Sequence, residues 1–343
     1  MSKSEISQEG WGVVGKTYMF DVLILGYSSI VKRRVLPALI SLAQVEKIHV
    51  ASQKGFSGEI IPPGKKGKVF LDYETALADC PPCLCYVSLP NSMHAEWAYR
   101  ALEKGFHVII DKPAVTKRSD AVELAELANR QGLCISEANV WTYHPLMQTV
   151  SKIVRVDDNA PLAAIAVFTS PPLDPGNFRY NPLYGAGVIL DRCPYVVSCG
   201  RVLYNDVPAK ISCDIVSVAE EGEIDISCSV TMIYPNRSTL MGFFSLGTEY
   251  RNTLSIIGKS LSCDVDRIFT PPADFEGSVV VSRKNIREVM SVPKYDAFAG
   301  YLKDIINCID NNSFSHFGRI FLDDSCVLGD LRIAANANLT GVS

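Results

Sequence analysis

The stretch that decides the fold runs from Cys85 to Pro113 and reads CYVSLPNSMHAEWAYRALEKGFHVIIDKP. Short apolar runs, Leu84 to Leu89 and His107 to Ile110, lie on either side of a segment with helical spacing, from about Ser92 to Lys104. Gly105 ends that segment. The pattern predicts a strand, a helix and a second strand. Because the crossover is long and the strands are apolar, we expect parallel pairing, with ligands beyond the carboxyl ends of the strands.

A second strand, turn and helix precede this unit. Phe20 to Leu25 is apolar, Gly26 follows, and a helix is expected from about Ile30 to Leu42. A strand, turn and helix of this kind hold the pyrophosphate of a dinucleotide on the free N–H groups at the helix start. The usual G-x-G-x-x-G/A pattern is degenerate here, since Ser28 replaces the second glycine and Val31 the third small residue.

The next predicted strand, Ile48 to Ser52, indicates which cofactor is bound. NAD sites usually place a carboxylate at the end of this strand, whereas this chain has Ser52, Gln53 and Lys54 and no acidic residue between Val50 and Ser57. A hydroxyl and a cation suit a 2′-phosphate. We therefore predict NADP(H), with NAD(H) as the alternative, and note that Lys54 could also be an ordinary solvated loop residue.

The second half of the chain has a different periodicity. Beyond Leu162, the runs AIAVFTS, KISCDIVSV, IDISCSVTMIY, STLMGFFSL and TLSIIG alternate with the period of half-buried strands. They predict an α+β domain with a large, mostly antiparallel open sheet, completed by helices at about 294–311 and 323–337. The predicted organisation is a flexible arm (1–18), an α/β Rossmann domain with a parallel sheet (19–140), and a substrate-binding and oligomerisation domain (141–343).

These motifs together resemble the glucose-fructose oxidoreductase, inositol dehydrogenase and rhizopine-catabolism (Gfo/Idh/MocA) family. The central stretch is similar to the family signature of a proline-asparagine turn, a helical histidine, G-x-H-V and E-K-P, with Asp111 in place of the glutamate. GYSSIVKRRVLPAL resembles the family's dinucleotide turn and its later P-A-L. EANVWTYHPLMQ resembles E-A-x-x-x-R-x-H-P, and the segment from Gly185 to Tyr195 resembles G-G-G-x-L-x-D-x-G-x-H/Y.

The resemblance implies a set of site residues. The catalytic candidates are Lys112, Tyr195 and Asp191, and the weaker substrate-binding candidates are His144, Arg192 and Trp141. The cofactor-binding candidates are Gly26, Tyr27, Ser28, Ser29, Ile30, Ser52, Gln53, Lys54, Leu89, Pro90, Asn91, His94, Asp111 and Lys112. For His94, helix packing is preferred to catalysis. The family also commonly has a cis bond before the proline that corresponds to Pro113.

The predicted chemistry is hydride transfer between a nicotinamide and a ketone or hydroxyl of a sugar or nucleotide-sugar. Asp191 and Tyr195 lie four residues apart, so they share one helical face. Lys112 and Tyr195 can supply the charge and the proton that a developing alkoxide requires. The D-x-x-P-Y version of the motif resembles sugar ketoreductases and dihydrodiol dehydrogenases. The alternatives are a dihydrodiol or polyol dehydrogenase, or a non-catalytic dinucleotide-binding sensor.

Composition excludes several other classes. A net charge of −4 gives no basic surplus for nucleic acid, and no run of about 18 uncharged apolar residues predicts a membrane span. The polar first 18 residues do not resemble a secretory signal, and the 11 cysteines suit reduced thiols, so we expect a cytoplasmic protein. Cys80, Cys83 and Cys85 lack a second ligand pair, so no metal is predicted. The open sheet and the family resemblance imply a homo-oligomer, a dimer or tetramer.

Overall fold

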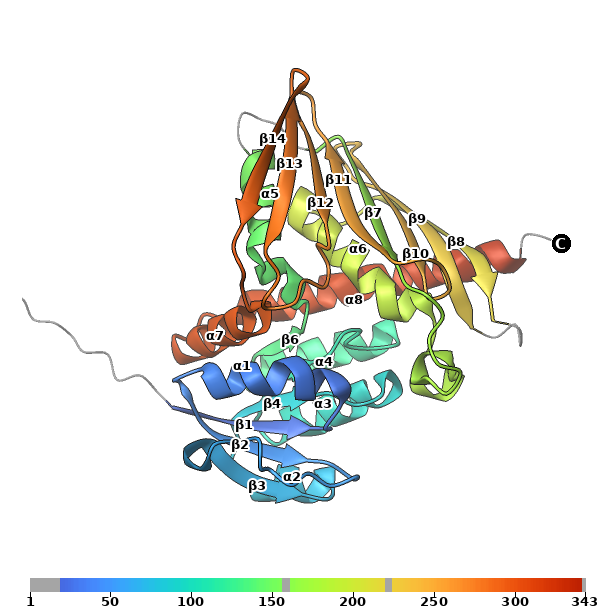
Figure 1. The fold of residues 1–343 in the computed structure, drawn as a ribbon. Coiled ribbons are helices and arrows are strands. Elements are labelled where there is room, and N and C mark those ends of the chain that lie inside the picture. Colours follow the sequence, from blue (N-terminus) through green and yellow to red (C-terminus); the bar gives the residue numbers. More distant parts are fainter. Residues whose placement is uncertain (1–18, 156–160, 220–223, 341–343) are drawn as a thin grey trace, which may run out of the picture.

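Two β-sheets with helices between and around them make up the protein (Figure 1). The computed structural model describes residues 19–155, 161–219 and 224–340. The predicted arm at 1–18 lies outside the described residues. In the described ranges, no helix combines the length and apolar character that crossing a membrane requires.

The first sheet has six parallel strands in the order β3-β2-β1-β4-β5-β6. They are β1 (Phe20–Leu25), β2 (Val45–Ala51), β3 (Lys66–Phe70), β4 (Leu84–Val87), β5 (His107–Ile110) and β6 (Ile135–Glu137). This confirms the predicted Rossmann sheet. The chain order reverses between β1 and β4, and a crevice for ligands is expected at that switch point.

Helices cover both faces of this sheet. The helices α2 (Tyr73–Asp79), α3 (His94–Glu103) and α4 (Arg118–Gln131) pack on one face. The other face is covered by α1 (Leu36–Ser41) and by α7 (Ala297–Asp310), which comes from the far end of the chain. Both faces are therefore closed over the central strands β1, β4 and β5, which is why these strands are largely apolar.

The helix expected from Ile30 to Leu42 is divided in two. A π-helical turn, Val31–Val35, precedes α1, and the N–H of Leu36 donates to the carbonyl of Val31 across this wider turn. Pro37 therefore lies in the first turn of α1, where a helix tolerates a residue without an N–H. This position accounts for a proline that a continuous helix would reject.

The second sheet has eight strands in the order β14-β13-β12-β11-β7-β10-β9-β8. They are β7 (Ala163–Thr169), β8 (Lys210–Val218), β9 (Asp225–Ile233), β10 (Thr239–Ser245), β11 (Arg251–Ile257), β12 (Ser262–Asp266), β13 (Gly277–Arg283) and β14 (Ile286–Val292). All neighbours pair antiparallel except β7 and β10, which are parallel. The predicted, mostly antiparallel sheet is confirmed.

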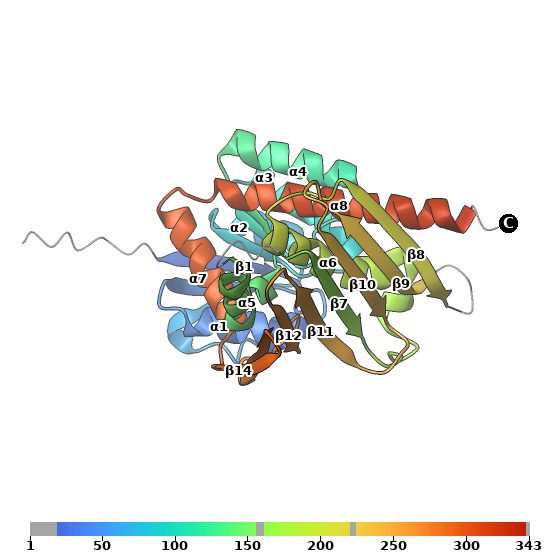
Figure 2. The same ribbon diagram turned by 90° about the horizontal axis from the view of Figure 1, so that it is seen from above.

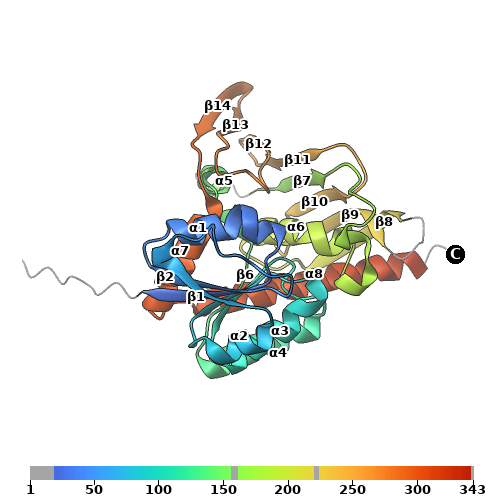
Figure 3. The same ribbon diagram turned by 60° about the horizontal axis from the view of Figure 1, so that its bottom comes forward.

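Three helices pack on one face of the second sheet, namely α5 (Pro145–Arg155), α6 (Val188–Tyr204) and α8 (Ser315–Thr340). Figure 3 shows α6 and α8 lying between the two sheets. Seen from above in Figure 2, α8 runs beside α4 and under the strands β8 to β10. The helix α8 begins at Ser315, earlier than the predicted 323, because Phe317 and Phe321 pack into the core of the first sheet.

The other face of the second sheet carries apolar side chains that no described segment covers. Ile165, Met241 and Ile257 are 38, 38 and 47% exposed on neighbouring strands. Exposed apolar side chains on adjacent strands are typical of association surfaces. The homo-oligomer remains a prediction that this surface motivates.

Candidate active site

A cleft of about 1700 Å³ opens along the carboxyl edge of the first sheet and continues to α6. All of the predicted cofactor-binding residues line it, namely Gly26, Tyr27, Ser28, Ser29, Ile30, Ser52, Gln53, Lys54, Leu89, Pro90, Asn91, His94, Asp111 and Lys112. Asp191, Tyr195, Arg192 and Trp141 line its other end. Segments far apart in the sequence therefore contribute to one continuous cavity.

The turn after β1 requires a glycine. Gly26 has a φ of +96°, which L-residues rarely adopt, and a Cβ at this position would lie 2.2 Å from the carbonyl oxygen of Ser88. The turn therefore packs directly on the end of β4. Ser28 forms a 2.8 Å hydrogen bond with Ser88 and accepts one from the N–H of Val31, at 3.2 Å.

The part of the cleft beside β2 contains a serine, a glutamine and a lysine. Ser52 is buried, and Gln53 and Lys54 are exposed. Three consecutive basic residues, Lys32, Arg33 and Arg34, also line the cleft. The sequence interpretation missed them, although three adjacent cations at the start of a phosphate-binding helix were a usable signal. The acidic side chain that lines this end is Glu59, seven residues after Ser52.

Asn91 and His94 hold the segment after β4 in place. The side-chain amide of Asn91 donates to the carbonyl of Gly185, at 2.7 Å, and so joins this segment to the loop before α6. His94 is 1% exposed, and its ring nitrogens lie 2.9 and 2.8 Å from the carbonyl oxygens of Pro113 and Leu89. Burial lowers the pKa of His94. These contacts support a structural role for His94.

The Asp-Lys-Pro loop meets α6 at the end of the cleft that Asp191 and Tyr195 line. The Lys112-Pro113 peptide bond is cis. Lys112 Nζ donates to the carbonyl of Asp191 at 2.7 Å and to its carboxylate at 3.1 Å, and lies 5.2 Å from the centre of the Tyr195 ring. Within the described part of the chain, no hydrogen bond holds the Tyr195 hydroxyl. The three predicted catalytic side chains are therefore neighbours.

Two arginines join this group. Nε of Arg179 lies 2.8 Å from one carboxylate oxygen of Asp191, and Nε of Arg192 lies 3.1 Å from the other. Arg192 also stacks on the ring of Phe168, with its guanidinium carbon 3.9 Å from the ring centre. Burial alone would raise the pKa of Asp191, but Lys112, Arg179 and Arg192 hold it below its usual range. Asp191 is therefore ionised, and three cationic side chains contact it.

A buried polar cluster lies behind the Asp-Lys-Pro loop. The carboxylate of Glu137 accepts the N–H of Ala114 at 2.8 Å and a hydrogen bond from Asn139. Asn139 also donates to Asp324 at 3.4 Å, and Asp324 pairs with Arg201 at 2.9 Å. Burial, reinforced by Asp324, raises the pKa of Glu137 to about 7. Because Arg201 lies on α6, the cluster links the loop to the helix that carries Tyr195.

The weaker substrate candidates separate in the structure. Trp141 lines the cleft, but it is 1% exposed and its indole N–H donates to Ser198 at 3.0 Å. His144 is completely buried, accepts the N–H of Leu146 at 3.2 Å and is not among the residues that line the cleft. The structure therefore does not bring His144 to the site, because the η4 turn (Val140–Tyr143) directs it into the core.

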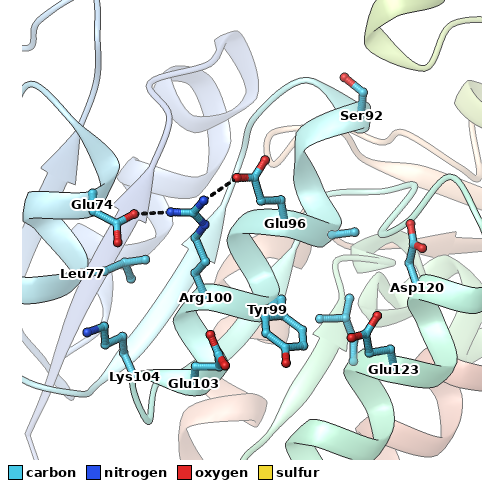
Figure 4. Close-up of a pocket in the computed structure, with 12 residues that line it drawn as sticks. Glu74, Leu77, Ser92, Glu96, Tyr99, Arg100, Glu103, Lys104, Asp120 and Glu123 are labelled. Atoms are coloured by element: carbon cyan, nitrogen blue, oxygen red, sulfur yellow. Dashed lines mark hydrogen bonds and ion pairs between the residues drawn. The ribbon is translucent and has the colours of Figure 1, made fainter.

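A second hollow lies on the outer surface of α2, α3 and α4 (Figure 4). Arg100 pairs there with Glu74 and with Glu96, and Glu103, Lys104 and Glu123 lie around it. The figure shows the Arg100 guanidinium between the two carboxylates. Such exposed ion pairs contribute little to folding stability, and the hollow contains none of the predicted site residues. Among the described residues, no group of histidine, cysteine or acidic side chains is arranged to hold a metal.

Comparisons with known proteins agree with this geometry. Residues 20–139 match the model of an oxidoreductase family with an NAD-binding Rossmann fold, and residues 160–262 match the GFO/IDH/MocA C-terminal domain. A dTDP-3,4-didehydro-2,6-dideoxy-alpha-D-glucose 3-reductase from Saccharopolyspora spinosa is 30% identical over 287 residues, covering 82% of this chain and 86% of that protein. A D-xylose 1-dehydrogenase (NADP(+)) from Haloferax volcanii is 25% identical over 63% of this chain and 66% of its own length.

Solved structures show the same fold. KijD10, a 3-ketoreductase from Actinomadura kijaniata in complex with NADP and TDP-benzene, superposes with a TM-score of 0.83 at 24% identity, covering 92% of this chain and 98% of that one. An aldose-aldose oxidoreductase from Caulobacter crescentus gives 0.80 at 17% identity, with coverage of 93 and 98%. With both domain models matched and a relative of 30% identity along most of its length, the chain belongs to the Gfo/Idh/MocA family of oxidoreductases.

Proposed function

We propose that this protein is an NADP(H)-dependent oxidoreductase that interconverts a ketone and a hydroxyl on the sugar ring of a nucleotide-linked sugar. The observation that carries the proposal is the meeting of Lys112, Asp191 and Tyr195 at one end of a cleft whose other end is the dinucleotide turn. Four proteins with sequences similar to this chain, among them the one from Saccharopolyspora spinosa, are 3-reductases of a dTDP-linked sugar, and this supports the substrate class.

The cleft fits a dinucleotide phosphate at one end. The positive φ of Gly26 places the β1 turn against β4 and directs the start of the next helix toward the cleft. Ser52 and Lys54 are suited to hold a 2′-phosphate, and Arg33 lines the same cleft. The absence of a carboxylate directly after β2 removes the usual partner of an unphosphorylated ribose. A bound nicotinamide cofactor supplies or accepts the hydride.

Lys112 and Tyr195 act on the oxygen of the reacting carbonyl. The Tyr195 hydroxyl can donate to the carbonyl oxygen while the carbonyl carbon takes the hydride. The ammonium of Lys112 stabilises the negative charge that develops on the same oxygen. Asp191 holds that ammonium in place through two contacts, at 2.7 and 3.1 Å, so the lysine needs little reorganisation during the reaction. In the oxidative direction the same groups accept the proton.

The charge of this end of the cleft supports an anionic substrate. Lys112, Arg179 and Arg192 all contact one carboxylate, that of Asp191, so cations are in excess there. A pyrophosphate attached to the sugar would balance that excess, since guanidinium groups pair well with phosphate oxygens. A free sugar offers no such charge. We therefore expect the nucleotide diphosphate to contribute to binding.

Steady-state assays with NADPH test the proposal. A dTDP-linked 3-keto sugar, the same 3-keto sugar without the nucleotide, and a cyclic polyol with NADP⁺ form a suitable panel, and NADPH absorbance gives the rate. We expect the highest kcat/KM for the nucleotide-linked ketone. Equal values with and without the nucleotide would contradict the assigned substrate class. Cofactor binding without turnover of any compound would favour a dinucleotide sensor.

A further inference from the structure

Two positions at which this chain departs from the family pattern are connected in the structure. Ser28 replaces the second glycine of the dinucleotide turn, and Asp111 replaces the glutamate before the catalytic lysine. The hydroxyl of Ser88, at the end of β4, joins them: its oxygen lies 2.8 Å from that of Ser28, and it donates to the carboxylate of Asp111. All three residues line the cleft.

The hydrogen bonds that run from Ser28 through Ser88 to Asp111 have a defined direction. A hydroxyl has one proton to donate, and Ser88 gives its proton to Asp111. Ser28 must therefore give its own proton to Ser88, while it accepts the N–H of Val31 at 3.2 Å. Tyr86 donates to the other oxygen of Asp111 at 2.6 Å. With Asp111 ionised, Ser28 can offer the cleft only a lone pair.

A Ser28 hydroxyl that donates to Ser88 does not suit a bound dinucleotide. The second position of the glycine turn is where the backbone of a Rossmann fold comes closest to the pyrophosphate. An anionic oxygen accepts hydrogen bonds and is repelled by a hydroxyl lone pair. If Ser28 turns its proton to the phosphate, Ser88 must turn its proton to Ser28. Asp111 would then keep a partly buried charged oxygen without a hydrogen-bond donor, which is unfavourable.

A proton on Asp111 resolves the conflict. Protonated at the oxygen that faces Ser88, Asp111 donates to Ser88, Ser88 donates to Ser28, and Ser28 donates to the phosphate. Every hydroxyl keeps a donor and an acceptor role, and Tyr86 still donates to the other Asp111 oxygen. The one bond formed is the O–H bond of the Asp111 carboxyl, with a proton from solvent, while the two serine hydroxyls keep their own protons and only rotate.

We propose that binding of the cofactor pyrophosphate at the Gly26–Ile30 turn is coupled to the uptake of one proton by Asp111, through the hydroxyls of Ser88 and Ser28. This inference rests on the proposed function, since it concerns the same cofactor. It assigns to Asp111, which no step of hydride transfer uses, the role of setting which way the phosphate-binding hydroxyl points.

The surroundings of Asp111 are compatible with a change of protonation. Burial raises its pKa, and the hydrogen bonds from Ser88 and Tyr86 oppose that effect. The ionisable groups that face it are His94 from α3, whose ring nitrogens contact the carbonyls of Pro113 and Leu89, and Lys112, whose ammonium is occupied by Asp191. His94 is therefore the competing position for the proton.

Calorimetric titration with NADP⁺ near pH 7 tests the coupling. Heats measured in two buffers with different ionisation enthalpies, HEPES and Tris, give the number of protons taken up on binding. We expect the wild-type protein to take up more protons than Asp111→Asn, by a difference that approaches one. The subtraction cancels any proton taken up by the cofactor's own phosphate. The affinity of the wild-type protein should also weaken with rising pH, by up to tenfold per unit, relative to Asp111→Asn.

Two further variants and a control variant keep the test from depending on whether any one protein folds correctly. Ser88→Ala removes the hydroxyl that connects Ser28 to Asp111, and Ser28→Gly restores the family residue. Both variants should therefore bind NADP⁺ without the extra proton. Ser29 lies in the same turn but is not part of the Ser28–Ser88–Asp111 hydrogen bonds. Ser29→Ala should therefore keep the proton uptake, whatever its affinity for NADP⁺. Proton uptake that is equal in wild type and Asp111→Asn would overturn the coupling and leave the proposed function intact. No binding of NADP⁺ by the wild-type protein would contradict the proposed function itself.

Discussion

Replacing Glu137 with glutamine tests the buried cluster behind the Asp-Lys-Pro loop. Glu137 is 8% exposed and accepts the N–H of Ala114, directly after the cis Lys112-Pro113 bond. Burial and the nearby Asp324 raise its pKa from 4.5 to about 7. Glutamine keeps the shape and an acceptor oxygen but removes the titration.

The expected size of the effect follows from that shift. The folded state holds the proton more tightly than the unfolded state, so the stability gained from the protonated group is fully present below pH 4.5 and is lost as the pH rises through about 7. One pKa unit corresponds to about 1.4 kcal/mol. Between about pH 5.5 and about pH 8, the wild-type protein should therefore lose about 2 kcal/mol of unfolding free energy relative to Glu137→Gln.

Urea unfolding of both proteins at the two pH values measures this difference by linear extrapolation. Any pH-independent loss of unfolding free energy in Glu137→Gln, such as that from a weaker contact to Asn139, is the same at both pH values and cancels when they are compared. Glu123→Gln, which changes an exposed carboxylate on α4, is the matched control for loss of an acidic charge. A difference between wild type and Glu137→Gln that stays constant with pH, within about 0.5 kcal/mol, would refute the reasoning that Glu137 stays protonated to about pH 7.

Four other outcomes are expected. Lys112→Ala and Tyr195→Phe should each lower turnover by roughly a hundred- to ten-thousand-fold with little change in NADPH affinity. The loss of turnover in the double variant should be much smaller than the product of the two single losses. Near-normal turnover in Tyr195→Phe would mean that Tyr195 is only a packing residue. Ser52→Asp should shift cofactor preference toward NADH in parallel titrations, and an unchanged preference would remove Ser52 from the 2′-phosphate site. Asp191→Asn should raise KM and, because it releases Lys112, also lower kcat; normal kinetics would leave Asp191 no role at the site. Light scattering should give a mass well above the 37.6 kDa of one chain, whereas a monomer would contradict the association surface on the second sheet.

Regular elements were the predictable part of the fold. The apolar strands around Cys85 and Val108 and the alternating runs of the second sheet have periods that follow from burial on two faces or on one. The edge strand β14 escaped prediction because six of its seven residues are exposed, so it has no alternation to detect. The packing of α7 on the first sheet depends on contacts between distant segments, which periodicity does not report.

The site was predictable where motif residues end regular elements. Lys112 follows a parallel strand and Asp191 and Tyr195 lie on one helix, and the structure brings these positions together across 79 residues. Arg179 escaped prediction because it comes from a short 3₁₀ turn without periodicity. The role of Ser88 was equally hidden, since a serine at a strand end indicates nothing until its partner Asp111 is located in space.

Transfer of deuterium from NADPH labelled at both C4 positions to a dTDP-linked 3-keto sugar is the most direct test of the central claim. The sugar product should gain one deuterium at the reduced carbon in mass spectra, and Lys112→Ala should slow its appearance in proportion to turnover. A protein that binds NADPH and the nucleotide sugar but leaves the sugar unlabelled would contradict hydride transfer between them, and with it the assignment of Lys112, Asp191 and Tyr195 as a catalytic group.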